Sequence, residues 1–558
     1  MVHWPEASTM AAEREESGEK PGSVVLRFMT HVKSGEPHRR ARRFPMAPEA
    51  TSDVASNSGT LATSAPPTLD AAVPGAFPAD ASPVPSTAFE KRFGHPPGLV
   101  ILFFAEMWER FSYYGMRTLL VLYMVNYLFV EGRPQKVIGY SFVNWFYNNP
   151  GIQPLSSHIY GLYTGLVYLT PLLGGLLADR ILGQRKTVIV GSILMAMGHF
   201  LMAFENLFFV ALLFLIFGNG AFKPNVSSQV GGLYPPGDTR RDRAFSIFYV
   251  GINSGAFLQL VCGTLAEHFG AQTVADTPNP NFDPAHPGLG WHYGFGAAGV
   301  GMLLGLFVYL AGQKNLAPDN VMKRKAAASI ATPFPAPPVA KQELTQTERA
   351  SIIALCALCA LNIIFWAVYE QQGNTMQLWA SNQTYWPTVF GWQIPSTWFQ
   401  SFNPFMIFVF TPLLNMLWSW QAARGKEPSS VAKMAIGCTV LGLSFIVMVV
   451  GAYVVGPGKG SIFWPFACTA MLTIGELYLS PIGLSLVTKV APARMVSLLM
   501  GMWFMASFFG NYLSGYIGSF YSVMPKTHFF LLLTVLGVTA GIAIAAFNRP
   551  LRRAIGKV

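Results

Sequence analysis

The sequence predicts an all-α polytopic membrane protein with twelve transmembrane helices in two six-helix bundles. Three observations predict this fold class. Of the 558 residues, 52% are hydrophobic and only 12% are charged, whereas a soluble domain carries about twice that share of charge. Apolar stretches long enough to cross a bilayer recur twelve times along the chain. A polar, basic stretch separates the sixth of them from the seventh.

The first 92 residues are rich in Ala, Ser, Pro, Glu and Arg, and they contain no apolar run that could form the core of a signal peptide. We predict that residues 1–92 form a disordered N-terminal tail. A misplaced start codon would produce the same pattern, so it stays open whether this tail belongs to the mature protein.

The predicted spans divide into an N-terminal bundle, residues 93–313, and a C-terminal bundle, residues 350–548. Residues 314–349 are polar, basic and proline-rich, as expected of a cytoplasmic linker, and residues 549–558 form a short tail. The connector 129–156 is long and semi-apolar, and its length allows an additional extracellular hairpin. The spans lie near 97–128, 157–179, 186–204, 206–225, 243–267, 293–313, 350–371, 397–421, 432–455, 461–488, 494–520 and 528–547.

The basic residues predict the orientation. Connectors after even-numbered spans, with the C-terminal tail, hold 21 lysines and arginines, whereas the opposite connectors hold four. The positive-inside rule therefore places both termini in the cytoplasm, in a plasma or inner membrane. This asymmetry also explains the net charge of +11 without any nucleic-acid partner. The five cysteines lie in apolar runs without metal-ligand neighbours, so no metal site is predicted.

The first span carries a polar stripe. Each charge near the centre of a spanning helix opposes insertion by about 2.5–3.5 kcal/mol, so the stripe should face a water-filled cavity or the bundle interior, where ion pairing lowers this cost. Glu–Arg pairs that serve folding alone are the alternative, although an apolar stripe would fold at less cost. Six side chains share this helix face because they are spaced by three, one, three, one and three residues: Glu106, Glu109, Arg110, Tyr113, Tyr114 and Arg117.

The fourth span carries a lone cation, Lys223, beside Pro224 and after Gly218 and Gly220. These glycines and the proline suggest a helix that bends or opens locally. Lys223 needs an anionic partner, and the first-span glutamates could supply one. The alternative is a lysine that snorkels to the membrane surface, because the span ends near Asn225.

The second half carries its own acids. Glu370 lies at the extracellular end of the seventh span in FWAVYEQQGN, and Glu476 lies in the middle of the tenth in GELYLSPIG. Burial favours the protonated form of a carboxyl group, so an intramembrane acid can exchange a proton at working pH and is a candidate functional residue. The alternative for Glu370 is a simple acid at the end of a helix. This alternative fits Glu476 less well.

A basic motif, GGLLADRILGQRK, follows the second span. Its glycines let helices pack closely, and Asp179 beside Arg180 and Arg185 can form a charge network across the helix junction. The motif resembles the loop motif of the major facilitator superfamily at the same place. A positive-inside anchor with incidental glycines is the alternative.

Longer motifs resemble one family of that superfamily. EMWERFSYYG, residues 106–115, is similar to the ExxERFxYYG motif of proton-coupled oligopeptide transporters, the POT/PTR family, at every fixed position. GNGAFKPNVSS and FYVGINSGAF resemble its second signature, and FWAVYEQQGN, WFQSFNP and GELYLSPIGLSLVTKVAP resemble its motifs in the C-terminal half. The resemblance runs from about residue 93 to residue 553.

The resemblance implies a role for each matching residue. Proton coupling would involve Glu106, Glu109, Arg110, Lys223 and Glu370. In the pocket, Arg117 and Lys223 would meet a peptide carboxylate and Glu476 its ammonium group. The peptide backbone would be held by Tyr113, Tyr114, Tyr168, Asn253 and Asn403, and Trp503 would form part of the pocket wall.

The function that this implies is a proton-coupled symporter that imports di- and tripeptides and peptide-like compounds by alternating access. Its partners would be small peptides, protons and the lipid bilayer, a monomer would suffice, and protons would replace any cofactor. A transporter of nitrate or another small anion and a non-transporting peptide receptor stay open as alternatives. An enzyme is not expected, since the sequence contains neither HExxH nor GxSxG.

Overall fold

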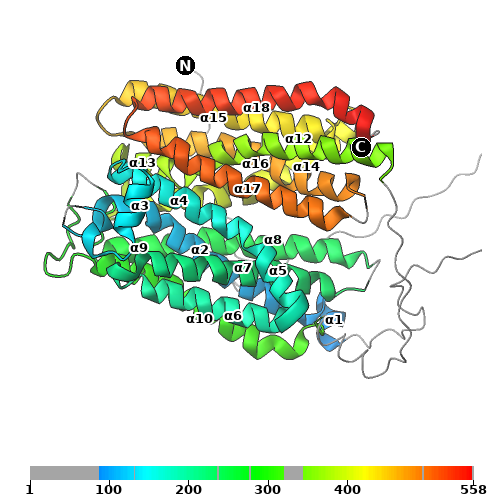
Figure 1. Ribbon diagram of the computed structural model, residues 1–558, viewed down its shortest axis with the longest axis horizontal. Helices are drawn as coiled ribbons and strands as arrows, with labels where there is room; N and C mark the ends of the chain where they lie inside the picture. Colours follow the sequence, from blue (N-terminus) through cyan, green and yellow to red (C-terminus); the bar gives the residue numbers. More distant parts are fainter. Residues whose placement is uncertain are drawn as a thin grey trace, which may run out of the picture. The chain divides into compact units, whose positions relative to one another are not determined.

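The computed structural model describes residues 87–130, 132–235, 238–274, 278–319, 344–492 and 495–555. The predicted N-terminal tail up to residue 86 and linker residues 320–343 therefore lie outside the described residues. The described part belongs to one packing unit, residues 82–558. Most of it is helical (Figure 1).

The helices before the predicted linker are called the first half, and those after it the second half. The first-half helices are α1 (Ala88–Phe93), α2 (Pro97–Tyr123), α3 (Tyr140–Phe146), α4 (Ile152–Leu169), α5 (Pro171–Leu177), α6 (Gln184–Leu201), α7 (Phe208–Gly232), α8 (Arg240–Leu258), α9 (Leu260–His268) and α10 (Leu289–Gly312). The second-half helices are α12 (Gln346–Tyr369), α13 (Thr375–Asn382), α14 (Phe402–Ala423), α15 (Ser430–Val455), α16 (Phe463–Val490), α17 (Val496–Gly518) and α18 (Lys526–Ile555).

Four two-residue strands lie in the connectors of the second half. β1 (Thr384–Tyr385) pairs in parallel with β4 (Gly460–Ser461), and β2 (Thr388–Val389) pairs antiparallel with β3 (Trp392–Gln393). In the first half, the long connector 129–156 forms α3, which turns back into α4.

Nine helical segments of the described residues are long and apolar enough to cross a membrane, which confirms a polytopic α-helical membrane protein. Three further helices, α2, α6 and α17, lie where spans are predicted but are not among these nine, so the count of twelve stays a prediction. In α2 the reason is the charge of its polar stripe. The nine are Ile152–Leu182, Glu205–Gly232, Arg240–His268, Leu289–Asn315, Gln346–Asn382, Ser396–Ala423, Ser430–Val455, Phe463–Val487 and Lys526–Asn548.

The helices of each half pack mainly against one another, and Figure 1 shows them as two groups. In the first half α2 packs against α8 and α10, and α7 against α5 and α6. In the second half α15 packs against α16 and α18, and α12 against α17 and α18. The halves meet where α4 packs against α17 and α8 against α14. The bundle boundaries, residues 93–313 and 350–548, remain predictions.

Glycines allow the closest of these approaches. A Cβ atom at Gly174 would lie 2.9 Å from the Cα of Ala221, so α5 and α7 touch through their backbones. Between the halves, a Cβ at Gly161 of α4 would lie 2.5 Å from the Cα of Gly515 on α17. Of the glycines in the GGLLADRILGQRK motif, Gly174 therefore packs closely as expected, whereas a Cβ atom at Gly175 would meet nothing within 4 Å. Helix α7 runs without a break through Pro224, so it does not open there, and the alternative of a local bend stays a prediction.

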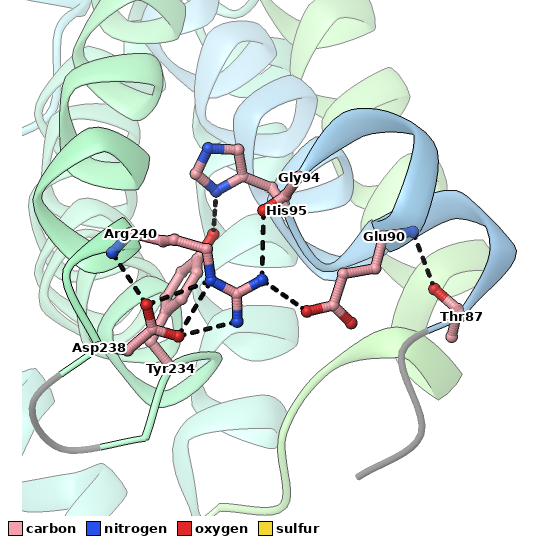
Figure 2. A network of polar contacts seen from close by, with 7 residues as sticks. All are labelled: Thr87, Glu90, Gly94, His95, Tyr234, Asp238 and Arg240. Carbon is pink, nitrogen blue, oxygen red and sulfur yellow. Dashed lines mark hydrogen bonds and ion pairs between the residues drawn. The ribbon is translucent and has the colours of Figure 1, made fainter. Parts of the chain in front are cut away.

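The short helix α1 is bound to the connector between α7 and α8 (Figure 2). Arg240 donates from Nη1 to Glu90 Oε1 at 2.7 Å and to the Gly94 carbonyl at 3.2 Å, and it also pairs with Asp238. His95 Nδ1 lies 2.8 Å from the Tyr234 hydroxyl. We call this set of contacts the α1 network. It connects the start of α2 to the C-terminal end of α7.

Candidate functional site

A cavity of about 270 Å³ lies between the two halves. Its walls come from α2, α4, α7 and α8 on one side and from α12, α14, α16 and α17 on the other. The structure thus brings most of the predicted site residues to one place. Those that line the cavity are Glu106, Arg110, Tyr114, Arg117, Tyr168, Lys223, Asn253, Glu370, Asn403, Glu476 and Trp503.

Arg110 binds both glutamates of its own helix. Its Nε atom lies 3.2 Å from Glu106 Oε1, and its Nη2 atom donates to Glu109 Oε1 at 2.9 Å. All three side chains are almost completely buried. Arg110 offsets one of the two carboxylate charges and contacts both carboxyl groups. This pairing lowers the cost of placing these charges in the first span.

Lys223 is paired differently from the prediction. Its Nζ atom lies 4.5 Å from the centroid of the Tyr168 ring, an arrangement typical of a cation–π contact. Among the residues that the structure describes, no carboxylate lies within 4.0 Å of this ammonium group, because Arg110 already holds both first-span glutamates. Lys223 lines the cavity. It forms no direct ion pair with those glutamates in this conformation, and their role as its anionic partners stays a prediction.

Arg117 forms an ion pair that crosses between the halves. Its Nη2 atom donates to Glu370 Oε2, and its Nε donates to the Tyr160 hydroxyl at 2.6 Å. Glu370 lies in the turn after α12 and is 1% exposed. Gly373 makes room for this contact, since a Cβ there would lie 2.7 Å from Arg117 Nη2. The pair holds the end of α12 against α2 and α4.

Glu476 lies on the opposite wall of the cavity, in α16. The Nδ2 atom of Asn403 donates to its Oε2 at 2.8 Å and also lies 3.0 Å from Thr473 Oγ1. In the described part of the chain Glu476 has no basic ion-pair partner within 4.0 Å. The Tyr369 side chain also forms a hydrogen bond with Glu476. A carboxyl group held by neutral groups such as this hydroxyl and the Asn403 amide retains the capacity to bind a cation.

Polar contacts between the halves cluster at one end of the cavity. Gln259 Nε2 donates to the Gln400 carbonyl at 2.9 Å, and Trp398 Nε1 donates to Thr264 Oγ1 at 2.8 Å. These residues lie near the connectors after odd-numbered spans, which the charge asymmetry predicts to be extracellular. These bonds, like the Arg117–Glu370 pair, join the two halves at that end.

Comparison with known proteins gives the family. A sequence model of the POT family matches residues 185–335 and 327–533. The peptide transporter YePEPT of Yersinia enterocolitica is 34% identical over 76% of this chain and 88% of its own length. The di-/tripeptide transporter of Lactococcus lactis subsp. cremoris is 30% identical over 84% of this chain and 98% of its own.

The chain belongs to the POT family. A solved structure of a mutant of the peptide transporter POT in complex with alafosfalin superposes with a TM-score of 0.68, at 32% identity, over 85% of this chain and 98% of that one. A POT family transporter in complex with 5-aminolevulinic acid gives a TM-score of 0.66 at 28% identity, over 84% of this chain and 99% of that one. The fold is therefore that of the major facilitator superfamily, as predicted, and the relatives are transporters rather than enzymes.

Two predicted site residues of this POT family member lie behind the cavity wall. Glu109 is fully buried and, besides the two hydrogen bonds from Arg110, accepts a third, at 2.8 Å, from Asn219 Nδ2. Tyr113 is buried under Arg110, whose guanidinium carbon lies 5.3 Å from the tyrosine ring centroid. Its hydroxyl group has no hydrogen-bond partner in the described part of the chain. Neither side chain reaches the cavity in this conformation.

Several residues at the site were missed by the sequence analysis. Asn219 precedes Lys223 by four residues and Tyr160 precedes Tyr168 by eight, so helical spacing places each pair on one face and could have indicated both. The remaining members are neutral and carry no signal in one sequence. The cavity wall also includes Tyr249, Gln259, Trp366, Tyr369, Gln372, Gln400, Ser480, Phe504 and Ser507.

The predicted loop motif lies far from the cavity, at the junction of α5 and α6. Arg185 Nη2 donates to the backbone carbonyl of Ala317 at 3.0 Å and also to that of Leu316, which follow α10. Asp179 and Arg180 are exposed within a π-helical turn. The motif thus attaches the α5–α6 junction to the chain that leads into the linker. Among the described residues, no group of His, Cys, Asp and Glu could hold a metal ion.

Proposed function

We propose that this protein is a proton-coupled symporter that imports di- and tripeptides and peptide-like compounds by alternating access. One observation carries the proposal. A single cavity is lined by two cations of the first half, Arg117 and Lys223, and by the carboxyl group of Glu476 in the second. A peptide zwitterion needs opposite charges at its two ends, and this cavity offers them on opposite walls.

Peptide binding would draw the halves together. The carboxylate would be bound by Lys223 and Arg117 and the ammonium group by Glu476, so one bound molecule spans both halves. The hydroxyl and amide groups of Tyr114, Asn253 and the other polar wall residues would bind the peptide backbone. Contacts to the termini and backbone alone suit many side chains, because every di- or tripeptide presents these groups.

Protons would act on the first-span glutamates. When Glu106 or Glu109 binds a proton, it becomes neutral and its attraction for Arg110 weakens. Arg110 is then free to attract another anion, including a bound carboxylate, so proton binding and peptide binding become coupled. Release of both on the other side restores the glutamate pairs. Each cycle then returns the protein to its starting charge.

Glu370 would control the outer end. Its pairing with Arg117 can form only while the outer ends of α2 and α12 are close, so loss of this pair favours opening. A proton on Glu370, or a peptide carboxylate that competes for Arg117, would each weaken it. The loop motif with Asp179, Arg180 and Arg185 would stabilise the cytoplasmic side. The charge asymmetry supports cytoplasmic termini in a plasma membrane, and nothing in this cycle requires more than a monomer.

The proposal is tested with the full chain in proteoliposomes. A labelled dipeptide should accumulate when the pH outside is lower than inside and should only equilibrate without a gradient. Nitrate uptake under the same gradient is the comparison, because a small anion is the alternative substrate. Accumulation of nitrate but not dipeptide would replace the peptide assignment, and dipeptide binding without uptake would indicate a receptor.

A further inference from the structure

Helix α3, in the connector between α2 and α4, exposes large aromatic side chains. Phe142, Trp145 and Phe146 are 65%, 69% and 61% exposed. They share one helix face because they are spaced by three and one residues. The ring centroid of Phe142 lies 6.1 Å from that of Trp145 and 6.4 Å from that of Phe146. We call these three side chains the α3 aromatic face.

This helix has a fixed place on the protein. The backbone N–H of Ile138, just before α3, donates to the Asn206 carbonyl at 3.0 Å, and Tyr140 packs against Phe129 with ring centroids 5.3 Å apart. After the helix, Tyr147 stacks on His158 of α4 at 4.4 Å. The α3 aromatic face is thus held outward by contacts on both sides of it.

The turn that follows α3 fixes its direction. Asn148 and Asn149 have φ angles of 62° and 51°, in the left-handed region that asparagine tolerates better than most residues. Two such residues in succession reverse the chain within a few residues of the start of α4. The exposed rings therefore belong to a defined structure rather than to an extended loop.

The α3 aromatic face continues the surface that meets lipid. Helix α4 begins a membrane-spanning segment at Ile152, and its His158 lies 6.0 Å from Tyr516 of α17. Tyr512 and Tyr516, at the same end of α17, are 41% and 53% exposed. Aromatic side chains gather where a bilayer meets water, and an uncharged aromatic helix face lies well in that layer. Residues 140–146 contain no Lys, Arg, Asp or Glu.

We propose that α3 is a membrane-interface anchor whose aromatic face is inserted among the headgroups and upper acyl chains of the leaflet at this end of the protein. The partner is a lipid surface. Three large rings exposed to water forgo the favourable free energy of burying apolar surface. The neighbouring lipid can cover all three rings without another protein. Such an anchor would fix the outer ends of α2 and α4, between which α3 lies in the chain.

The test uses the full chain in phosphatidylcholine vesicles. The difference between the fluorescence of the wild-type protein and that of Trp145→Phe isolates Trp145, and the variant keeps an aromatic ring in place. We expect the difference spectrum to be blue-shifted, to lose most of its intensity when the acyl chains carry bromine near the headgroup, and to respond weakly to aqueous iodide. A single symmetrical peak on size exclusion checks that the variant is folded.

Phe142→Ser/Phe146→Ser is the second variant. It keeps Trp145 but removes two of the three rings, so Trp145 should become more sensitive to iodide and less sensitive to brominated lipid. Strong iodide quenching of wild-type Trp145 without quenching by brominated lipid would overturn the proposal in favour of a water-exposed helix. Protection from both quenchers would overturn it in favour of a protein partner or a second copy of the chain.

Discussion

Two arginines of α2, Arg110 and Arg117, lie two helical turns apart and bind their acids in opposite ways. Arg110 pairs with Glu106 and Glu109 of its own helix, whereas Arg117 pairs with Glu370, which lies 253 residues away in the second half. Both pairs are buried and both line or adjoin one cavity. Arg110 contacts two carboxyl groups and Arg117 one, and only the partners of Arg110 belong to the same rigid element as the arginine.

This difference gives the two pairs different consequences. The pairs within α2 do not depend on how the two halves move relative to each other. Only a proton or a competing ion can therefore break them. The pair between the halves exists only while the outer ends are close, so a movement of the halves breaks it directly. The same chemistry therefore suits a proton sensor in one place and a gate in the other. The predictions below alter one pair at a time.

The largest effect is expected at the pair between the halves. Glu370→Gln leaves Arg117 buried without its anion, and removing one partner of a buried ion pair costs about 3–5 kcal/mol. We expect a strong shift toward an open outer end, measured as a longer distance between spin labels placed at the outer ends of α4 and α17. The double variant Arg117→Gln/Glu370→Gln removes both charges and should be more stable to heat than Glu370→Gln. Equal stability of the two would show that the pair is not a stabilising contact.

The second effect concerns the acid that has no basic partner. Glu476→Ala should weaken dipeptide binding about 10- to 100-fold, because a hydrogen bond between charged groups contributes about 1.5–3 kcal/mol. An N-acetylated dipeptide lacks the ammonium group and should lose far less affinity. Binding of both ligands is measured by competition for uptake, and equal losses would remove Glu476 from ammonium recognition.

The third prediction tests the ion pairs within α2 separately from the Arg117–Glu370 pair. Glu109→Gln keeps the hydrogen bond from Asn219 but cannot exchange a proton, so gradient-driven accumulation should disappear while peptide exchange continues. A gradient of one pH unit stores about 1.4 kcal/mol per proton, which corresponds to about tenfold accumulation in the wild type. The internal-to-external ratio of labelled dipeptide measures this. A ratio that stays near tenfold would show that Glu109 does not couple protons.

The smallest effect is expected in the α1 network, outside the membrane (Figure 2). Burial, and then Arg240 and Arg243, lower the pKa of His95 below its usual 6.5. The folded state thus binds fewer protons than the unfolded state, so the contribution of His95 is present above about pH 6.5 and is lost as the pH falls through the lowered pKa. Between pH 7.5 and 5, His95→Gln should lose about 1–2 °C less in melting temperature than the wild type. Identical losses would show that His95 does not titrate in this range.

Much of the fold and part of the candidate site could be predicted from local sequence patterns. The helices fall close to the predicted spans because long apolar runs have few other structures in a bilayer. The pairs of Arg110 were implied by spacing, since residues three and four apart meet on one helix face. The contacts of Lys223 could not be predicted in full, because spacing within α2 and α7 does not show that Arg110 contacts both glutamates while Lys223 lies over the Tyr168 ring. The pairing of Arg117 with Glu370 could not be predicted, because no local spacing connects them.

The sequence by itself determined the membrane-spanning helices, the polar stripe of α2 and the acids that the bilayer makes costly, because these depend on composition and on the fixed geometry of one helix. Only the tertiary structure decided which charges neutralise one another, which of them face a shared cavity and which end of the protein is closed. Those outcomes depend on distances between separate helices. Such distances are set by packing at residues such as Gly161 and Gly515, whose contact joins parts of the chain more than 350 residues apart.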